Sequence, residues 1–253
     1  MKIDNKIVVL TGSEGLIGRS VKKYLLKNNT KLICLDIKKN SKKNSFDYYS
    51  CNLLDEKEII KIKNEKIQKY RKIDALINLA CVNDPVENSK KIVSFENLDP
   101  KIFKDHVEKN IMMTFLPCKV FGSQMQKSRK GSIINFASTY GIVAPDQNIY
   151  KANGKRFFIK DAAYPTAKSA IIGLSKYLAS YWSEKNIRVN VVAPGGVENK
   201  QNKFFIKNYI HKTLSKRMAN TSDFNGTVHL LISEQSDYIT GAIFSVDGGW
   251  TTI

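Results

Sequence analysis

The chain has 253 residues, 42% of them hydrophobic, which is enough to bury a sizeable core in one large α/β domain or two small ones. Its formal net charge of +18 is carried mostly by lysines spread along the whole chain. Nucleic-acid-binding proteins more often concentrate arginine-rich charge on one element, so we interpret the charge as a solvated surface. No apolar segment is long enough to cross a bilayer, and the first residues lack the apolar run of a signal peptide. The sequence therefore predicts a protein that binds neither a membrane nor nucleic acid.

The cysteines and histidines argue against a disulfide framework and against a metal site. The four cysteines form no CxxC pair and lie mostly inside apolar runs, at Cys34, Cys51, Cys81 and Cys118. This usage is typical of reduced thiols in a cytoplasmic protein. The three histidines are scattered, at His106, His211 and His229, so we expect no bound metal.

A glycine-rich turn follows the first predicted strand. Residues 7–10 are an apolar run, residues 11–18 contain the turn, and an amphipathic stretch continues to Asn28. Strand, glycine-rich turn and helix in this order are typical of a dinucleotide site. We expect Gly12 to allow the tight turn, Gly15 to let the backbone approach a pyrophosphate, and Gly18 to let the helix pack near the strand. A plain glycine turn is the alternative.

An acidic residue ends the second predicted strand. Asp36 follows the apolar run at residues 31–35, near the distance from Gly18 at which a ribose-binding carboxylate is expected. A carboxylate there accepts hydrogen bonds from both ribose hydroxyls and repels a 2′-phosphate, so we favour NAD over NADP. Lys38 and Lys39 could each reach a 2′-phosphate, and a simple loop role for Asp36 is the alternative.

The remaining elements alternate in the way that a parallel sheet requires. Further strands are predicted at residues 48–53, 74–80, 132–137, 187–192 and 242–246. Helices are predicted at residues 56–70, 101–125, 163–182, 203–217 and 223–232, the last with Ser222 as N-cap, and loops at 39–43 and 82–100. Right-handed crossovers would wind these elements into a single α/β domain spanning residues 1–253, a Rossmann-type doubly wound parallel sheet flanked by helices. Ligands bind at the carboxyl ends of such strands, where Thr11, Asp36, Asn78 and Ser138 fall.

A tyrosine and a lysine four residues apart open the helix at 163–182. Tyr164 and Lys168 share one helix face, and Pro165 is tolerated only in a first turn, so Tyr164 is expected at the helix start. The positive end of the helix dipole and the Lys168 ammonium would then lower the pKa of Tyr164 toward that of a general base. Taken alone, the same spacing is common on solvated helix faces.

A long segment without a predicted core element separates Ser138 from Tyr164. This insert, residues 140–163, contains four cations, Lys151, Lys155, Arg156 and Lys160, with Tyr150, Phe157 and Phe158 among them. Long structureless segments inside a compact domain are usually functional. Two interpretations stay open: a cationic and aromatic substrate wall, or a solvated loop docked by its two phenylalanines.

Taken in order, these motifs resemble those of the short-chain dehydrogenase/reductase family over nearly the whole chain. The matching residues are the glycine turn at 11–18, Asp36, Asn78-Leu79-Ala80, Asn110, Ser138, Tyr164 with Lys168, Pro194-Gly195 and Asp247-Gly248-Gly249. The resemblance implies that Tyr164 is the acid/base and that Lys168 lowers its pKa and holds the nicotinamide ribose. It also implies that Ser138 bonds the reacting oxygen and that Asn110 holds a water in the proton relay.

The resemblance further implies the residues of the cofactor pocket. They are Gly12, Ser13, Gly15, Leu16, Ile17, Gly18, Asp36, Asn52, Leu53, Asn78, Ala80, Tyr164, Lys168, Pro194, Gly195 and Val197. Three positions depart from the family pattern. Cys81 stands in place of a glycine, Asn52 in place of an aspartate that often meets the adenine, and Asn199 in place of a threonine that often touches the carboxamide.

A narrower resemblance concerns the substrate. Residues 138–141, the insert, residues 194–199 and residues 248–250 resemble a bacterial subgroup associated with sugars for flagellin or lipopolysaccharide modification. This implies an NAD-dependent oxidoreductase acting on a secondary alcohol or ketone of a phosphorylated or nucleotide-linked sugar. The substrate contacts would be Ser138, Lys151, Lys155, Arg156 and Gly196.

The sequence also leads to an expectation about oligomeric state and leaves two alternative functions open. The family implies a homodimer or homotetramer that meets through the helices at 101–125 and 163–182. One alternative function is an epimerase or dehydratase that keeps NAD tightly bound. Another is a non-catalytic nucleotide-sensing or nucleic-acid-binding protein. The presence of Ser138, Tyr164 and Lys168 argues against this alternative.

Overall fold

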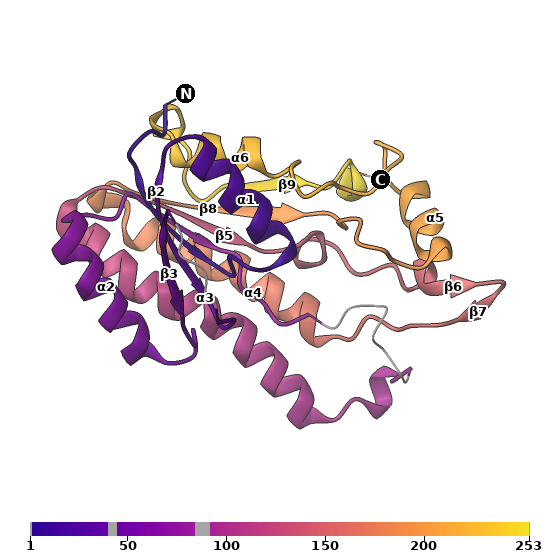
Figure 1. Cartoon of the computed structure of the whole chain (residues 1–253). Coiled ribbons are helices and arrows are strands. Elements are labelled where there is room, and N and C mark those ends of the chain that lie inside the picture. The colour runs from indigo at the N-terminus through magenta and orange to yellow at the C-terminus, as the bar shows by residue number, and fades with distance from the viewer. Residues whose placement is uncertain (1, 40–44, 84–91, 253) are drawn as a thin grey trace.

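The computed structural model describes residues 2–39, 45–83 and 92–252, and in these ranges the chain forms one parallel sheet covered by helices (Figure 1). Seven strands pair in the order β3-β2-β1-β4-β5-β8-β9, all neighbours running parallel. Their bounds are β1 Ile7–Thr11, β2 Lys31–Asp36, β3 Asp47–Ser50, β4 Ala75–Asn78, β5 Gly131–Phe136, β8 Ile187–Pro194 and β9 Ile243–Val246. The predicted doubly wound parallel sheet is confirmed.

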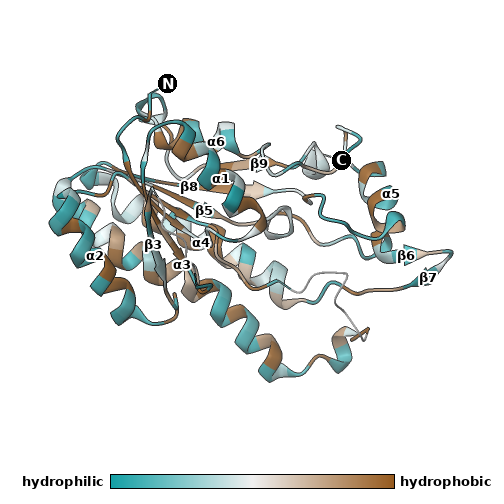
Figure 2. Cartoon of the chain, viewed as in Figure 1, coloured by the Kyte–Doolittle hydropathy of each residue, from teal (hydrophilic) through white to brown (hydrophobic). Residues whose placement is uncertain are grey.

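Helices cover both faces of the sheet because each buried strand presents apolar side chains to both sides. Val8 and Leu10 pack with residues of α1 and α6, whereas Ile7 and Val9 pack with residues of α2, α3 and α4. The alternation has the period of two expected for a strand. Helix bounds are α1 Leu16–Lys27, α2 Glu56–Tyr70, α3 Pro100–Ser128, α4 Ala163–Tyr181, α5 Lys203–His211 and α6 Asn225–Ile232. Figure 2 shows apolar residues concentrated on the strands and on helix faces turned toward them.

The strand order reverses beside β1, and this creates the place where a ligand can bind. β1 lies between β2 and β4, with Thr11 in register with Leu35 on one side and with Asn78 on the other. The crossovers from β1 and β4 leave in opposite directions, so a crevice opens at the carboxyl ends of these strands. Among the described residues, no helix has both the length and the apolarity needed to cross a membrane.

Several predicted element boundaries were wrong, among them the ends of the strand expected at 74–80, which is β4, and of the helix expected at 101–125, which is α3. The helix expected at 203–217 ends at His211, because the chain turns at Lys212 and Thr213, whose backbone N–H groups bond to Tyr209 and Ile210. The strand expected at 48–53 is the shorter β3. The last helix has Phe224 at its N-cap position, so Ser222 is not the cap; its carbonyl instead accepts from the backbone of Asn225 in a preceding turn. The expected loops at 39–43 and 82–100 fall partly outside the described residues.

The insert has more structure than predicted. It holds a short 3₁₀ helix, Gln147–Tyr150, followed by a two-stranded hairpin of β6 Lys151–Ala152 and β7 Lys155–Arg156, which projects beyond the sheet (Figure 1). Tyr150 and Phe158 are buried in a separate cluster with residues of α5 and with Trp250. Isolated aromatic residues without periodicity gave no signal of this second core, so the expectation of no core element was wrong.

Gly18 is tightly packed at the start of α1. A substitution there tests whether the turn between β1 and α1 needs a residue without a side chain. A Cβ added at Gly18 would overlap the carbonyl oxygen of Gly12. We expect Gly18→Ala to lower the free energy of unfolding by about 3 kcal/mol, as overpacking does. Gly226→Ala is the control, because a Cβ there meets nothing within 4 Å, and it should stabilise helix α6 slightly. Equal urea midpoints for Gly18→Ala and the wild type would contradict this account.

Candidate active site

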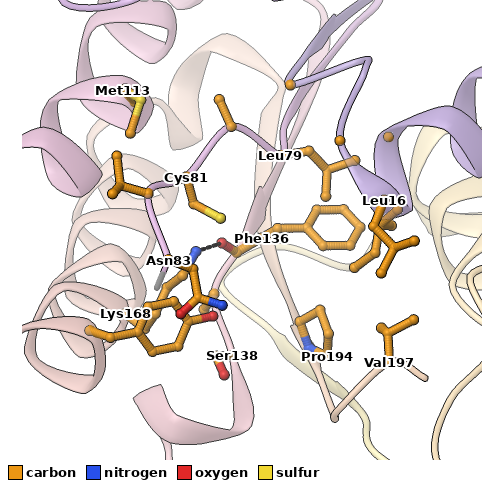
Figure 3. A pocket seen from close by; sticks show the side chains of 18 of the residues that line it. Leu16, Leu79, Cys81, Asn83, Met113, Phe136, Ser138, Lys168, Pro194 and Val197 are labelled. Carbon is orange, nitrogen blue, oxygen red and sulfur yellow. Dashed lines mark hydrogen bonds between the residues drawn. The ribbon is translucent and has the colours of Figure 1, made fainter. Parts of the chain in front are cut away.

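A cavity of about 750 Å³ opens at the carboxyl ends of the central strands. Figure 3 shows side chains from the β1–α1 turn, from the ends of β4 and β5, and from the segment after β8 facing one another across it. Most of the predicted site residues line it: Gly12, Gly15, Leu16, Ile17, Gly18, Asp36, Asn52, Leu53, Ala80, Ser138, Tyr164, Lys168, Pro194, Gly195, Gly196 and Val197. Residues from distant parts of the chain therefore form one site.

The glycine turn brings backbone close to backbone at the floor of the cavity. Gly12 has φ +65°, and a Cβ on it would lie 2.6 Å from the backbone nitrogen of Ala80. Gly15 is the N-cap of α1 and has no side chain to fill the space in front of the helix. The first N–H groups of a helix lack partners within the helix and carry its positive dipole end. This cradle fits a pyrophosphate.

Asp36 stands at the end of β2, at the far side of the same turn. Its carboxylate accepts hydrogen bonds from the backbone N–H of Glu14 at 2.8 Å and of Lys38 at 3.1 Å. These bonds fix the carboxylate at the rim of the cavity, where it fits the two hydroxyls of a ribose. Lys38 lines the cavity as well.

Helix α4 delivers Tyr164 and Lys168 to the middle of the cavity. The helix begins at Ala163, and Asp161 Oδ1 accepts from the backbone N–H of Ala163 at 2.7 Å and of Tyr164 at 3.2 Å. The predicted position of Tyr164 in the first turn is confirmed. Lys168 Nζ donates to the carbonyl oxygen of Phe136 at 3.0 Å (Figure 3) and lies 5.6 Å from the centre of the Tyr164 ring.

Burial dominates the protonation of this pair. It raises the pKa of Tyr164, and the hydrogen bond with Ser138 acts in the opposite direction. Burial also lowers the pKa of Lys168. The predicted lowering of the Tyr164 pKa is therefore wrong in this structure, because desolvation of the phenolate outweighs the favourable helix start. Burial therefore favours the protonated phenol of Tyr164, which can exchange a proton with a partner bound beside Ser138.

The side chain of Asn110 forms hydrogen bonds with the backbone of the segment that follows β4. Its Oδ1 accepts from the backbone N–H of Val82 at 3.0 Å, and its Nδ2 donates to the carbonyl oxygens of Val82 at 3.0 Å and His106 at 2.9 Å. Both amide hydrogens are thus used on backbone atoms. The side chain fixes the segment after β4 against α3 and does not line the cavity.

Two residues predicted to contact the cofactor point elsewhere. Asn78 is buried and donates to Asn135 Oδ1 at 2.8 Å and to Cys118 Sγ at 3.2 Å. Asn135 in turn donates to Ser175 Oγ at 2.9 Å, which ties β5 to α4. Ser13 is fully buried beside Cys34. Neither Asn78 nor Ser13 lines the cavity, so the structure does not support side-chain contact with a ligand.

Three of the four cations predicted to form a substrate wall are also elsewhere. Lys155 and Arg156 are exposed on the β6–β7 hairpin, and Lys151 does not line the cavity. Of the four cations of the insert, Lys160 does line the cavity, and its Nζ lies 4.1 Å from the centre of the Tyr164 ring. The cavity also has an aromatic and apolar wall, in which Tyr150 was predicted from the sequence and Tyr140, Phe205, Tyr209 and Met218 were missed. Only the aromatic richness of the insert hinted at it.

The family model described as enoyl-(acyl carrier protein) reductase matches residues 17–251. The chain belongs to the short-chain dehydrogenase/reductase family. It is an oxidoreductase with a fold that binds a nicotinamide dinucleotide. Enzymes of this family act on small molecules and are commonly oligomeric.

Individual relatives differ in what they do. A crystal structure of a short-chain dehydrogenase from Leptospira borgpetersenii with bound NAD⁺ is 33% identical, with a TM-score of 0.87 over 99% of this chain and 94% of that chain. A post-translational flagellin modification protein A from Campylobacter coli is 27% identical over 98% of this chain and 99% of its own length. A 7α-hydroxysteroid dehydrogenase from Bacteroides fragilis is 28% identical over 99% and 96%, respectively.

Proposed function

We propose that this protein is an NAD-dependent oxidoreductase that exchanges hydride with a secondary alcohol or ketone of an anionic sugar used in surface glycan or flagellin modification. The observation that carries the proposal is the convergence of Ser138, Tyr164 and Lys168 on one wall of a cavity whose floor is the glycine turn. A hydroxyl, a phenol and an ammonium so placed can manage the proton that must leave an alcohol as its hydride is removed.

In the proposed mechanism the protein moves the proton. The chemistry that a bound nicotinamide would supply is hydride transfer. Ser138 Oγ bonds the substrate oxygen, and Tyr164 gives or takes its proton. Lys168, fixed on the Phe136 carbonyl at 3.0 Å, stabilises the phenolate and holds the nicotinamide ribose. Asn110 keeps the Val82 segment in place beside the cavity, and its amide is not available to hold a relay water as the sequence predicted.

NAD is the proposed cofactor. Asp36 would accept from the ribose hydroxyls and repel a 2′-phosphate, and the Leptospira relative is described with NAD⁺. The pyrophosphate would lie on the backbone of Gly15, Leu16 and Ile17 at the start of α1. The remaining contacts would come from cavity-lining residues: Asn52, Leu53, Ala80, Pro194, Gly195 and Val197.

The sugar is proposed from the flagellin modification relative together with the cationic cavity. We also propose a homodimer or homotetramer that meets through α3 and α4. The stacked, exposed rings of Tyr177 and Tyr181 on α4 support this choice, since large aromatic residues on a helix face are typical of interfaces.

A substrate screen tests the proposal. Purified protein would be assayed for NAD reduction, and for thermal shift in the presence of NAD, across sugar phosphates, sugar acids, nucleotide sugars and their neutral parents. A ligand that binds only the folded protein raises its melting temperature in proportion to saturation. Net NADH formation with an anionic sugar is expected. Tightly bound NAD that purifies with the protein and gives no net NADH would indicate the epimerase or dehydratase alternative instead.

A further inference from the structure

Two phenols are hydrogen-bonded to each other in the wall of the active-site cavity. The hydroxyl oxygens of Tyr140 and Tyr150 lie 3.2 Å apart, and both residues line the cavity. Tyr140 is held beside Ser138, whose Oγ accepts from the backbone N–H of Tyr140 at 3.2 Å. Tyr150 ends the 3₁₀ helix of the insert and is only 2% exposed. The segment after β5 and the insert thus bring this phenol pair together.

Apolar rings fix the position of the pair. Tyr140 packs edge-on against Trp250, with ring centres 6.5 Å apart. Tyr150 packs against Phe158 and stacks on Phe205, with ring centres 5.0 Å and 5.5 Å apart. These rings belong to the second core that joins the insert to α5. Because both tyrosine rings rest on that core, their hydroxyls have a defined place in the cavity wall.

The pair carries one hydrogen more than its own bond uses. Each phenol has one O–H and can also accept hydrogen bonds. Burial raises the pKa of both Tyr140 and Tyr150, so both keep their hydrogens at neutral pH. One hydrogen makes the bond between them, and the other has no acceptor among the residues that the structure describes. A ligand that displaces water from this second hydrogen loses affinity unless it supplies an acceptor.

The pair lies in the same space as the proposed acid/base. Burial is the main cause of the raised pKa of Tyr150, and the neighbouring phenols of Tyr140, Tyr209 and Tyr164 add to it. Tyr140 also adds to the raised pKa of Tyr164, after burial and Cys81. Interactions between charges weaken with distance, so these effects agree with the cavity in placing the phenols around one space. A group bound to the pair is therefore close to the reacting carbon.

A hydroxyl group is the partner that matches this pair. It can accept the second hydrogen and donate its own hydrogen to a phenol oxygen. A carboxylate or phosphate can only accept, and charged donors suit such anions better than a neutral phenol does. A methylene leaves the second hydrogen without a bond. The same wall offers little else, because Phe205 and Met218 are apolar and the Tyr209 hydroxyl accepts from the backbone N–H of Gly196.

We propose that Tyr140 and Tyr150 together form a specificity-determining site that binds a hydroxyl group of the substrate, on the carbon next to the reacting carbon or on the next but one. This proposal rests on the oxidoreductase function proposed above. It means that the enzyme selects polyhydroxylated substrates over alcohols whose neighbouring carbons carry only hydrogen. A site built to bond a substrate hydroxyl rejects the analogue that lacks it, because its own polar groups are then left unpaired.

Three four-carbon ketones test the site by their reduction with NADH: acetoin, 4-hydroxybutan-2-one and butan-2-one. They differ only in the presence and position of one hydroxyl. We expect the wild type to prefer at least one hydroxyketone to butan-2-one by about 30-fold or more in kcat/KM. Comparing this ratio between variants cancels the intrinsic reactivities of the ketones.

The variant to compare is Tyr140→Phe/Tyr150→Phe. It replaces both partners of one hydrogen bond by apolar groups of the same shape, which is nearly neutral for folding. We expect it to bind NADH like the wild type and to lower the hydroxyketone preference about tenfold, as loss of one hydrogen bond does. Tyr238→Phe is the control, because Tyr238 is fully exposed and lies outside the cavity, and it should keep the preference.

Three amides measure binding without turnover: lactamide, 3-hydroxypropionamide and propionamide. Each has a carbonyl like that of the ketones but does not accept hydride, and the three again differ only in one hydroxyl. They would be titrated into the enzyme–NADH complex and followed by NADH fluorescence. We expect one hydroxyamide to bind the wild type and Tyr238→Phe about tenfold more tightly than propionamide. The double phenylalanine variant should bind all three amides equally.

The outcomes separate this proposal from the one on which it rests. A hydroxyl preference of equal size in the wild type and the double variant would overturn the site, as would the absence of any preference in the wild type. An equal loss of kcat on all three ketones would mean that the pair only supports Ser138, and would also overturn it. Failure of the oxidoreductase function gives a different result: no compound oxidises NADH or reduces NAD, while the amides still bind with the expected preference.

Discussion

Replacing Tyr164 with phenylalanine is expected to lower kcat about 1000-fold while leaving the dissociation constant of NAD within about twofold of the wild type. The substitution removes only the phenol oxygen, and the ring keeps its half-buried position on the first turn of α4. Without that oxygen the side chain of residue 164 can no longer exchange the proton of the substrate oxygen. Steady-state NAD reduction with the best substrate of the screen and fluorescence titration of NADH measure the two quantities.

A second tyrosine of the same helix provides the control. Tyr177 is 61% exposed and lies on α4 away from the cavity, so Tyr177→Phe should retain wild-type kcat and NADH affinity. If Tyr164→Phe kept more than a tenth of wild-type turnover, Tyr164 would not be the acid/base. Loss of NADH binding together with turnover would point to a disturbed pocket instead.

The fold could be predicted from the sequence because local patterns and global topology agree in this chain. Residues 56–70 read as a charged amphipathic helix, and α2 has those bounds. Apolar runs at β1 and β2 are continuous, as expected for strands covered on both faces. The ends of elements were harder: α5 stops at His211 although the sequence stays basic to Arg217, since composition does not specify where a chain turns.

The cofactor side of the site was more predictable than the substrate side. Gly12, Gly18 and Asp36 follow fixed offsets from strand ends, and the sheet determines where those ends meet. Lys160 has no such offset. Its direction depends on Gln147, a contact within an irregular segment that no periodicity describes. Lys155 and Arg156 were equally plausible from the sequence, and only the hairpin shows that they are elsewhere.

The misassignment of Asn78 could have been avoided. Side chains alternate along a strand, and Leu76 packs toward α2 and α3 whereas Ile77 packs toward α1 and α6. Asn78 shares the face of Leu76, which places its amide beside Cys118 of α3. A residue at the end of a strand need not face the ligand. The wrong direction predicted for the pKa shift of Tyr164 has a different cause. The shift depends on burial, and burial is a property of the assembled cavity.

Substituting Asp36 with asparagine is expected to change the cofactor preference. The charge-assisted hydrogen bonds from the ribose hydroxyls are worth about 1.5–3 kcal/mol, so losing the charge should raise KM for NAD about 10-fold to 100-fold. The same change removes the repulsion of a 2′-phosphate and leaves Lys38 on the cavity wall to attract it. Measured as kcat/KM, the preference for NAD over NADP should fall by at least 100-fold.

Asparagine is the informative replacement because it separates charge from structure. Its Oδ1 can still accept from the backbone of Glu14 at 2.8 Å, whereas alanine would release the glycine turn. Asp4→Asn, at an exposed position near the first strand, controls for the change in net charge alone. An unchanged NAD to NADP ratio in Asp36→Asn would show that the carboxylate serves only the turn. Discrimination would then have to arise from another residue near the adenosine ribose.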